Sequence, residues 1–512
     1  MTVRNKVGLL LGPMLFFIIL FLPFGDNNPS TPRIAAIAVL MAVWWITEAI
    51  PIPATALIPV ALFPLMGIMS GKEVAPYYYN SYIFLFLGGF IIALAMEKWN
   101  LHRRIALHIL HTFGSNTRGL ILGFMTATAF LSLWISNTAA SMVMLPIGIS
   151  IILLAREQKR IAEDGSNSGD NRFDENFPLL IMLGIAYGAS IGGVGTLIGT
   201  PPNVVFLRIF EMEFPNAPEI TFAKWLTFGI PFVVLFLITG WLTLVHLLFP
   251  LGTVRVIASR DIIRKELKEL GPMTTAEKRQ FVVFIITALL WVFRRGIDVG
   301  QHFHLPGWSE LLNVPGADDG TVAIFMSLAL FLIPSGMQRG VMLMDWDTAK
   351  KLPWGILLLF GGGFALAAGF TKGGLSAWIG QRLFFVSRQP TVLIIVIVST
   401  VLTFLTELTS NTATTQMALP ILAAMARSAH LHPLMLMLPA TIAASCAFML
   451  PVATPPNAIV FGSGYVPIMK MVRAGIVLDI IGVGIILLVI YVFAIPVFSI
   501  TPHTFPAGWI GN

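Results

Sequence analysis

The sequence contains an ungapped internal repeat, and this repeat limits the folds open to the chain more than any other feature. Residues 136 to 138 read Ser-Asn-Thr, and the same three residues return at 410 to 412, which is 274 positions later. Other positions match at the same offset: Gly88-Gly89-Phe90 with Gly362-Gly363-Phe364, Ser132 with Thr406, and Leu145-Pro146-Ile147 with Leu419-Pro420-Ile421. A membrane-like composition repeats Leu and Ile by chance, but not Asn and Pro. The repeat therefore predicts two structurally related halves.

The composition places both halves in a membrane. Of the 512 residues, 56% are hydrophobic and only 11% are charged, and the apolar runs are long enough to cross a bilayer many times. The net charge of +7 comes from Lys and Arg in the short connections between apolar runs, which is typical of cytoplasmic loops. These observations predict an all-α polytopic membrane protein and exclude a nucleic-acid partner.

The apolar runs predict about eleven transmembrane helices. Two further runs, 119 to 154 and 390 to 427, carry the Ser-Asn-Thr motifs near their centres, and they have no charged turn there. Each is expected to be a re-entrant helical hairpin that ends inside the membrane. Two spans contain Gly and Pro that cannot continue a regular helix, in GGVGTLIGTPPN (192 to 203) and PVATPPN (451 to 457). The expected spans lie near 7–25, 33–50, 53–70, 80–98, 178–211, 224–250, 281–296, 319–335, 353–371, 433–463 and 474–498.

The order of these elements predicts inverted repeats. A hairpin returns to the face it entered from, and five spans separate the two hairpins, so they open on opposite faces. Basic residues such as Arg4, Lys6 and Arg156 favour a cytoplasmic N-terminus, and eleven spans then place the C-terminus outside. The expected domains are scaffold spans with an interfacial helix (1–115), transport elements (116–250), a cytoplasmic amphipathic linker (251–280), scaffold spans (281–389) and transport elements (390–512).

The duplicated cluster suits the binding of ions. A hairpin tip presents the carbonyls of one helix and the amides of the next, and an Asn side chain offers both an oxygen and a nitrogen. Ser132 and Ser136 are four residues apart on one helical face, as are Thr406 and Ser410, and this spacing places two oxygens beside each Asn. Such groups also serve only to join helices, but a purely structural cluster needs no broken span beside it.

Charge decides which ligand this cluster can take. Segments 119 to 155, 178 to 207 and 433 to 469 contain no Asp, Glu, Lys or Arg, and 389 to 426 contains only Glu407. A bound anion would therefore find no basic side chain in these elements, and cations would have to enter with it. Oxygen ligands without a carboxylate cage favour a monovalent ion such as Na⁺.

The two Ser-Asn-Thr motifs, IGTPPN (198 to 203), VATPPN (452 to 457) and WWITEAIPIPATALIP (44 to 59) resemble the divalent anion/sodium symporter family, and the resemblance covers essentially the whole chain. It implies a transporter of dicarboxylates, citrate or sulfate in the plasma or bacterial inner membrane. It also implies a homodimer in which a mobile domain crosses past a fixed scaffold as an elevator, with two or more Na⁺ ions.

The resemblance also assigns site residues. It implies one Na⁺ at Ser132, Ser136, Asn137 and the Gly199 carbonyl, and a second at Thr406, Ser410, Asn411 and the Ala453 carbonyl. The substrate would contact Asn137, Thr138, Thr200, Ser410, Asn411, Thr412 and Pro455. Because both motifs are intact, C4-dicarboxylates such as succinate, malate and fumarate are favoured; the alternatives are a sodium-independent dicarboxylate or tricarboxylate exchanger and a Na⁺/sulfate symporter.

Other function classes have less support. An enzyme would need a nucleophile, base or metal cluster at depth, and Glu407 alone does not supply one. A channel is disfavoured because two hairpins from opposite faces suggest a closed site. Glu407 is interpreted either as a coupling group or as a residue that fixes the hairpin through a base or backbone group, and Glu48 and Asp479 as structural residues.

Overall fold

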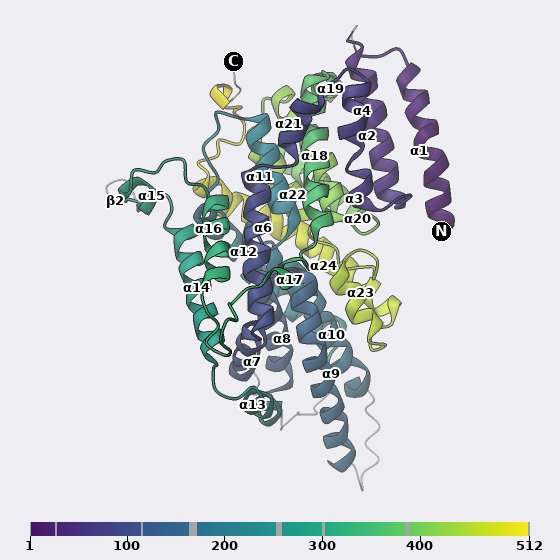
Figure 1. Cartoon of the computed structure of the whole chain (residues 1–512). Coiled ribbons are helices and arrows are strands. Elements are labelled where there is room, and N and C mark those ends of the chain that lie inside the picture. Colours follow the sequence, from purple (N-terminus) through teal and green to yellow (C-terminus); the bar gives the residue numbers. More distant parts are fainter. Residues whose placement is uncertain are drawn as a thin grey trace.

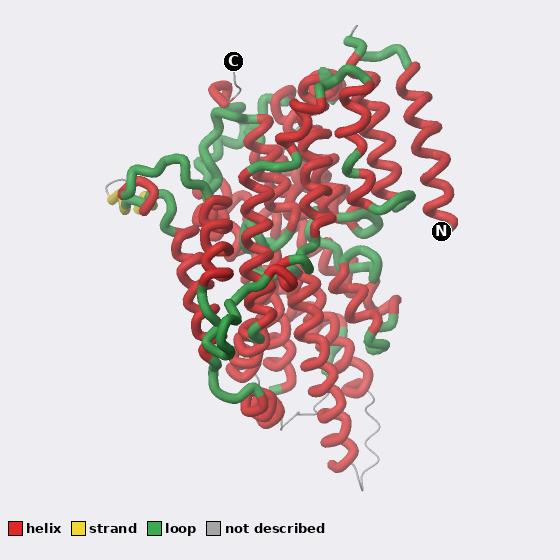
Figure 2. Tube along the Cα trace, viewed as in Figure 1, coloured by secondary structure: helices red, strands yellow, loops and turns green. Residues whose placement is uncertain are grey.

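The computed structural model describes residues 2–25, 28–113, 116–162, 172–251, 259–299, 303–383 and 389–509. Within these ranges the chain is almost entirely helical (Figures 1 and 2), and its one sheet is the antiparallel pair β1 (Ile297–Val299) and β2 (Phe303–Leu305). The predicted all-α class is confirmed. Parts of the expected loop 156 to 176 and of the basic segment 255 to 280 lie outside the described residues.

The first segment contains four long helices and several short ones. The interfacial helix expected at 100 to 114 is α7, and the span expected at 53 to 70 is instead split into α3 and α4, because Pro51, Pro53 and Pro59 interrupt regular hydrogen bonding. The elements are α1 (Val3–Phe21), α2 (Ser30–Thr47), α3 (Ile52–Thr55), α4 (Ile58–Leu65), α5 (Gly71–Val74), η1 (Ala75–Tyr77), α6 (Ser81–Lys98) and α7 (Leu101–Phe113).

The first hairpin and the first broken helix follow. The arms α8 (Thr117–Ser132) and α9 (Asn137–Ala162) meet at the Ser-Asn-Thr motif, as predicted. Next, α10 (Arg172–Gly193) and α11 (Pro201–Glu213) are separated by the unwound residues 194 to 200, and α12 (Phe222–Leu242) continues into the π-helical turn η2 (Thr243–Leu248). Both predicted interruptions of the first half are therefore present.

The second half has the same order of elements. After α13 (Ser259–Glu269), α14 (Thr275–Val292), α15 (Trp308–Leu311), α16 (Asp319–Leu332), α17 (Trp346–Ala349), α18 (Trp354–Lys372) and α19 (Leu375–Arg382), the second hairpin is formed by α20 (Thr391–Thr406) and α21 (Asn411–Ser428). The second broken helix is α22 (Leu434–Ala443) and α23 (Pro455–Gly462). The chain ends with α24 (Ile468–Val489), η4 (Ile490–Ala494), α25 (Ile495–Val497) and η5 (Ala507–Trp509).

Glycines let the helices approach closely. A Cβ at Gly188 would lie 2.6 Å from the Met125 carbonyl oxygen, so α10 and α8 pack backbone against backbone. A Cβ at Gly88 would lie 2.5 Å from the carbonyl carbon of Ala323 on α16. Small residues at helix crossings are typical of membrane helices, because lipid supplies little hydrophobic force to join them.

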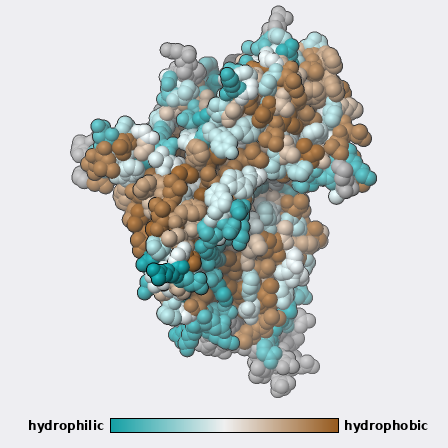
Figure 3. Space-filling model, in the orientation of Figure 1, coloured by the Kyte–Doolittle hydropathy of each residue, from teal (hydrophilic) through white to brown (hydrophobic). Residues whose placement is uncertain are grey.

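The outer helices carry apolar side chains on their exposed faces. Eight described helices are long and apolar enough to cross a membrane, and one of these is the hairpin arm α9. Figure 3 shows hydrophobic residues over α1 and α2 and over α14 and α16, whereas hydrophilic residues gather around α13. Leu10, Phe17, Phe325 and Leu332 are all more than half exposed, as expected of side chains that face lipid.

Candidate functional site

A cavity of about 460 Å³ lies where the two hairpin tips and the two helix breaks meet. Its volume is in the range of small-molecule sites. Among the residues that the structure describes around it, Glu48 is the only charged one. The predicted site residues that line it are Ser136, Asn137, Thr138, Gly199, Thr200, Ser410, Asn411, Thr412, Ala453 and Pro455. Residues from the two halves of the chain thus form one site.

Behind the first tip, polar groups gather around Asn137. One terminal atom of its amide lies 2.5 Å from the Ser132 hydroxyl oxygen, 3.2 Å from the Gly199 carbonyl oxygen and 3.3 Å from the Ala189 carbonyl oxygen. The Ser132 hydroxyl donates to the Ala189 carbonyl at 2.7 Å. Because three oxygens surround this atom, it is the amide nitrogen, which can donate hydrogen bonds to them.

The second tip repeats this arrangement. The Thr406 hydroxyl lies 2.7 Å from Asn411 Oδ1 and 2.9 Å from the Ala444 carbonyl oxygen, and it is fully buried. Ser132 and Thr406 therefore lie behind the cavity wall, each in contact with the Asn of its own motif, whereas the two Asn residues line the cavity.

The predicted common helical face of these oxygens is wrong. Ser132 is the last residue of α8 and Ser136 precedes α9, so the two serines do not share a helical face. Thr406 and Ser410 are separated in the same way by the end of α20 and the start of α21. The Ser136 hydroxyl instead accepts from the Ala139 amide at 3.2 Å, at the start of α9.

The Asn of each Thr-Pro-Pro-Asn motif satisfies the unwound backbone. The Asn203 amide nitrogen lies 2.7 Å from the Thr196 carbonyl oxygen and 3.3 Å from that of Val194. In the second break, Asn457 donates to the carbonyls of Ala447 at 3.2 Å and Leu450 at 3.0 Å. Both side chains are completely buried, which identifies them as structural members of the motif.

A different side chain joins each hairpin tip to its break. In the first half the Thr196 hydroxyl donates to the Leu133 carbonyl at 2.5 Å and accepts from the Gly199 amide at 3.0 Å. In the second half Glu407, which corresponds to Leu133, accepts from three consecutive amides, those of Phe448, Met449 and Leu450, at 2.6, 2.8 and 3.0 Å. Of the two interpretations of Glu407, these bonds fit fixation of the hairpin.

The two break threonines also differ. Thr454 caps α23 by accepting a hydrogen bond from the Asn457 amide at 3.3 Å, whereas Thr200 makes no side-chain cap on α11. Both line the cavity. The Thr200 hydroxyl is therefore not committed to its own helix.

The cavity also contacts helices outside the two motifs, and the sequence did not assign these contacts. They come from the α2–α3 connection, from α6 and from the start of α18: Glu48, Ile52, Pro53, Phe86, Phe90, Pro353, Gly355, Ile356 and Leu359. The first three lie inside the stretch WWITEAIPIPATALIP, so that stretch carried the signal. Glu48 has a φ of 50° at the end of α2, and its carbonyl accepts from the Asn5 amide at 2.6 Å.

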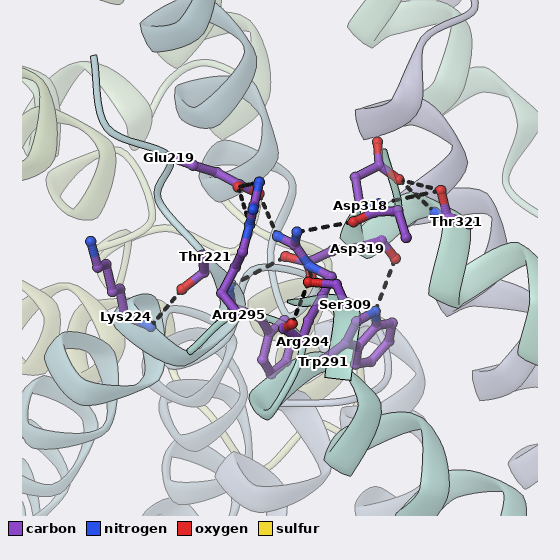
Figure 4. A network of polar contacts seen from close by, with 12 residues as sticks. Glu219, Thr221, Lys224, Trp291, Arg294, Arg295, Ser309, Asp318, Asp319 and Thr321 are labelled. Atoms are coloured by element: carbon purple, nitrogen blue, oxygen red, sulfur yellow. Dashed lines mark hydrogen bonds and ion pairs between the residues drawn. The ribbon is translucent and has the colours of Figure 1, made fainter. Parts of the chain in front are cut away.

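A second polar network lies away from the cavity, where the connection between α11 and α12 meets α14 and α16 (Figure 4). The buried Arg294 side chain forms ion pairs with Glu219 and, at 2.6 Å, with Asp319. Asp319 also accepts from the Phe222 amide at 3.3 Å. These bonds tie the segment predicted as a transport element to the segment predicted as scaffold.

Two solved transporter structures share the fold. The chain superposes on the YdaH transporter of Alcanivorax borkumensis with a TM-score of 0.56 and 14% identity, over 90% of this chain and 99% of that one. It superposes on MtrF of Neisseria gonorrhoeae with a TM-score of 0.55 and 12% identity, over 94% and 98% of the two chains. At these identities the likeness concerns the fold alone.

The sequence comparisons identify the family. Residues 4–500 match the sodium:sulfate symporter transmembrane region. The sodium-dependent dicarboxylate transporter SdcS of Staphylococcus saprophyticus is 44% identical over 503 residues, covering 98% of this chain and 93% of the relative, and that of Staphylococcus aureus is 43% identical over 487 residues, covering 95% and 90%. The chain is therefore an integral membrane transporter, not an enzyme, and it belongs to the sodium:sulfate symporter family.

Proposed function

We propose that this protein is a secondary active transporter that couples Na⁺ to the uptake of C4-dicarboxylates such as succinate, malate and fumarate. The observation that carries the proposal is the single cavity lined by both Ser-Asn-Thr motifs and both Thr-Pro-Pro motifs without a basic side chain among its described lining residues. Its relatives SdcS, which are named sodium-dependent dicarboxylate transporters, support the choice of ion and substrate.

In this proposal each half contributes one Na⁺ site. The first uses Ser132, Ser136, Asn137 and the Gly199 carbonyl, and the second uses Thr406, Ser410, Asn411 and the Ala453 carbonyl. The closeness of the Ser132 hydroxyl and the Gly199 carbonyl oxygen to the Asn137 amide, at 2.5 and 3.2 Å, supports the first site, because it gathers groups with oxygen ligands at one place. The number of Na⁺ ions is two or more.

The substrate lies between the two Na⁺ sites. Its carboxylates contact Asn137, Thr138 and Thr200 from one half and Ser410, Asn411, Thr412 and Pro455 from the other. Amides at the starts of α9 and α21 add favourable partial charge for an anion. The Na⁺ ions neutralise the dianion, because an unpaired dianion in this apolar cavity would be strongly destabilised.

An elevator movement would use the predicted division of the chain. Segments 116–250 and 390–512 carry the site across the membrane, and segments 1–115 and 281–389 stay fixed in a homodimer. The N-terminus is cytoplasmic and the C-terminus external. The Glu219–Arg294 ion pair crosses between these groups, so the movement must break it, and substitution of Glu219 should change the balance between the two end states.

The test is uptake into proteoliposomes. Labelled succinate, citrate and sulfate are supplied with and without an inward Na⁺ gradient, and succinate uptake is expected to need the gradient. Sulfate is the main competitor because the family description names it. Counterflow of succinate in the complete absence of Na⁺ would support exchange and overturn symport.

A further inference from the structure

A second cavity, the α19 cavity, lies between the end of α1 and the helices α2, α18, α19 and α21. Its volume is about 600 Å³, its described lining side chains are all apolar, and it shares no lining residue with the transport cavity. Leu22, which lines it, is 48% exposed, and hydrophobic residues cover the outer face of α1 and α2 (Figure 3). The α19 cavity is therefore continuous with the surface that faces lipid.

A positive charge stands beside this apolar cavity, on the ring of Trp378. The Trp378 side chain lines the cavity and packs against Phe24, with 5.0 Å between the ring centroids. The exposed guanidinium group of Arg382, the last residue of α19, lies over the same ring at 5.0 Å from its centroid. Stacking uses the flat face of a guanidinium group and leaves the N–H groups at its edge able to bind an anion.

The charges of the surrounding helices favour an anion at this place. None of the five helices that border the α19 cavity contains Asp or Glu. Two of their basic side chains are neutralised by other segments: Lys372 pairs with Glu73 at 2.6 Å, and Arg427 pairs with Glu213. In the part of the chain that the structure describes, Arg382 has no acidic partner, so its charge is available to a ligand.

The repeat places a similar cavity beside α7, the counterpart of α19. This cavity has a volume of about 660 Å³, and the same helix face borders both cavities. At the offset of 274, the matching pairs are Leu101 with Leu375, Arg104 with Trp378, Ile105 with Ile379, and His108 with Arg382. The arginine on the α7 face is neutralised, because Arg104 forms hydrogen bonds of 2.9 and 3.2 Å with the Glu277 carboxylate. Arg382 has no such partner, so the α19 cavity is the better candidate for a charged ligand.

We propose that the α19 cavity binds one anionic phospholipid, with an acyl chain inside the cavity and the phosphate group at Arg382. The apolar lining matches an acyl chain, and a basic side chain between membrane helices is the usual partner of an anionic headgroup. The bound chain would contact Met417 and Ile421 of α21, the hairpin arm that begins at Asn411. The inference goes beyond the proposed transport function and needs no step of it.

The headgroup contact is tested by thermal unfolding of the full chain in detergent, without Na⁺ or dicarboxylate. Phosphatidylglycerol and phosphatidylcholine with identical acyl chains are added in series, and the concentration that gives half of the stabilisation is measured. For wild type it should be at least about fivefold lower with phosphatidylglycerol, the effect of about one basic side chain near an anionic lipid. Arg382→Gln should respond to the two lipids within about twofold, and Arg382→Lys should keep most of the preference because it keeps the charge.

The acyl-chain contact is tested by filling the cavity. Ala38→Phe places a ring where the chain would lie and should weaken stabilisation by both lipids, and Ala42→Leu is a milder variant of the same kind. Glycerol phosphate, which carries the phosphate without a chain, should not stabilise wild type. Lys268→Gln removes an exposed basic side chain from α13 and is the charge-matched control, which should keep the preference for phosphatidylglycerol.

An unchanged lipid preference in Arg382→Gln would overturn the proposal, and so would an equal loss in Lys268→Gln, since the effect would then be one of surface charge in general. A cavity-filling variant with an unchanged lipid response but a changed oligomeric state in light scattering would assign the cavity to a second copy of the chain instead. If Ala38→Phe does not fold, Ala42→Leu and Arg382→Gln decide. Because these measurements use neither ion nor substrate, their failure is distinct from a failure of the proposed transport function.

Discussion

In the two halves of the cavity, different chemical groups join the hairpin tip to the helix break. In the first half the break supplies a side chain, Thr196, and the hairpin tip supplies a backbone carbonyl, that of Leu133. In the second half the tip supplies a side chain, Glu407, and the break supplies backbone amides. Leu133 and Glu407 occupy equivalent positions of the repeat. A related backbone therefore does not require related side chains, provided that every unwound polar group finds a partner.

This difference also separates a neutral half from a charged one. The first connection contains only a hydroxyl and backbone groups, whereas the second contains the carboxyl group of Glu407. Single substitutions in the two halves can test how far the halves are equivalent in binding and how far they differ in construction.

The largest effect is expected where the halves are alike. Asn137→Ala and Asn411→Ala should each reduce Na⁺-driven succinate uptake by at least about 100-fold, because in our proposal each removes contacts to both an ion and a carboxylate, worth about 3 kcal/mol together. Uptake into proteoliposomes measures this. A variant with near-normal, non-saturating flux would contradict a carrier site, and Asn216→Ala, outside the cavity, serves as the control.

A smaller effect is expected at the two residues whose carbonyls we propose as Na⁺ ligands. Gly199 and Ala453 are equivalent, but a Cβ at Gly199 would lie 2.8 Å from the Ser132 carbonyl oxygen and still closer to that of Gly193. Gly199→Ala should therefore destabilise the protein by about 1–3 kcal/mol and weaken Na⁺ binding. Ala453→Gly, which removes a methyl group, is the matched control and should keep most activity. If the two variants behave alike in thermal unfolding and uptake, the backbone is packed equally tightly at residues 199 and 453.

The hydrogen bonds between the first hairpin tip and its helix break can be removed without changing a charged residue. Thr196→Val removes the hydroxyl that bonds both Leu133 and Gly199, and should cost about 1–2 kcal/mol of stability. Thermal unfolding in detergent measures the loss, which should be the same from neutral to alkaline pH. A pH-dependent loss would show that this half also contains a titrating group.

The smallest effects are expected at the two break threonines. Thr454→Ala loses the cap of α23 and should lower stability by about 1 kcal/mol, whereas Thr200→Ala loses no cap. In our proposal Thr200→Ala instead raises the dicarboxylate concentration needed for half-maximal uptake, with little change in unfolding temperature. A fall in stability without any change in substrate dependence would remove Thr200 from the proposed site.

Much of this architecture could be predicted from the sequence because the repeat kept its polar residues at a fixed offset. Asn and Pro inside apolar runs marked both hairpin tips and both breaks, and the structure brings these four places to one cavity. Helix ends were less visible: the spacing of Ser132 and Ser136 suggested one helical face, but the chain leaves the helix between them. The α3–α4 break was also missed, since its prolines lie in a run whose hydropathy is that of a span.

The cavity wall contributed by α6 and α18 could not be predicted, because Phe86, Phe90 and Leu359 look like ordinary apolar residues in their helices. Their role depends on which helices lie against the hairpin tips, and that is a property of tertiary packing. Glu407 was recognised as unusual, but its three amide partners lie some 40 residues further along the chain. No local pattern reports such a contact.

The buried amides of Asn203 and Asn457 have a consequence for what can pass through the protein. Each makes the hydrogen bonds that water would make to an unwound chain. The backbone carbonyls of each break are therefore bonded by a side chain of the break itself. The carbonyls of the breaks then need no solvent partner while the cavity in front of them fills and empties. These bonded carbonyls offer water and small ions no free acceptor, which disfavours a continuous route through the breaks while the cargo moves.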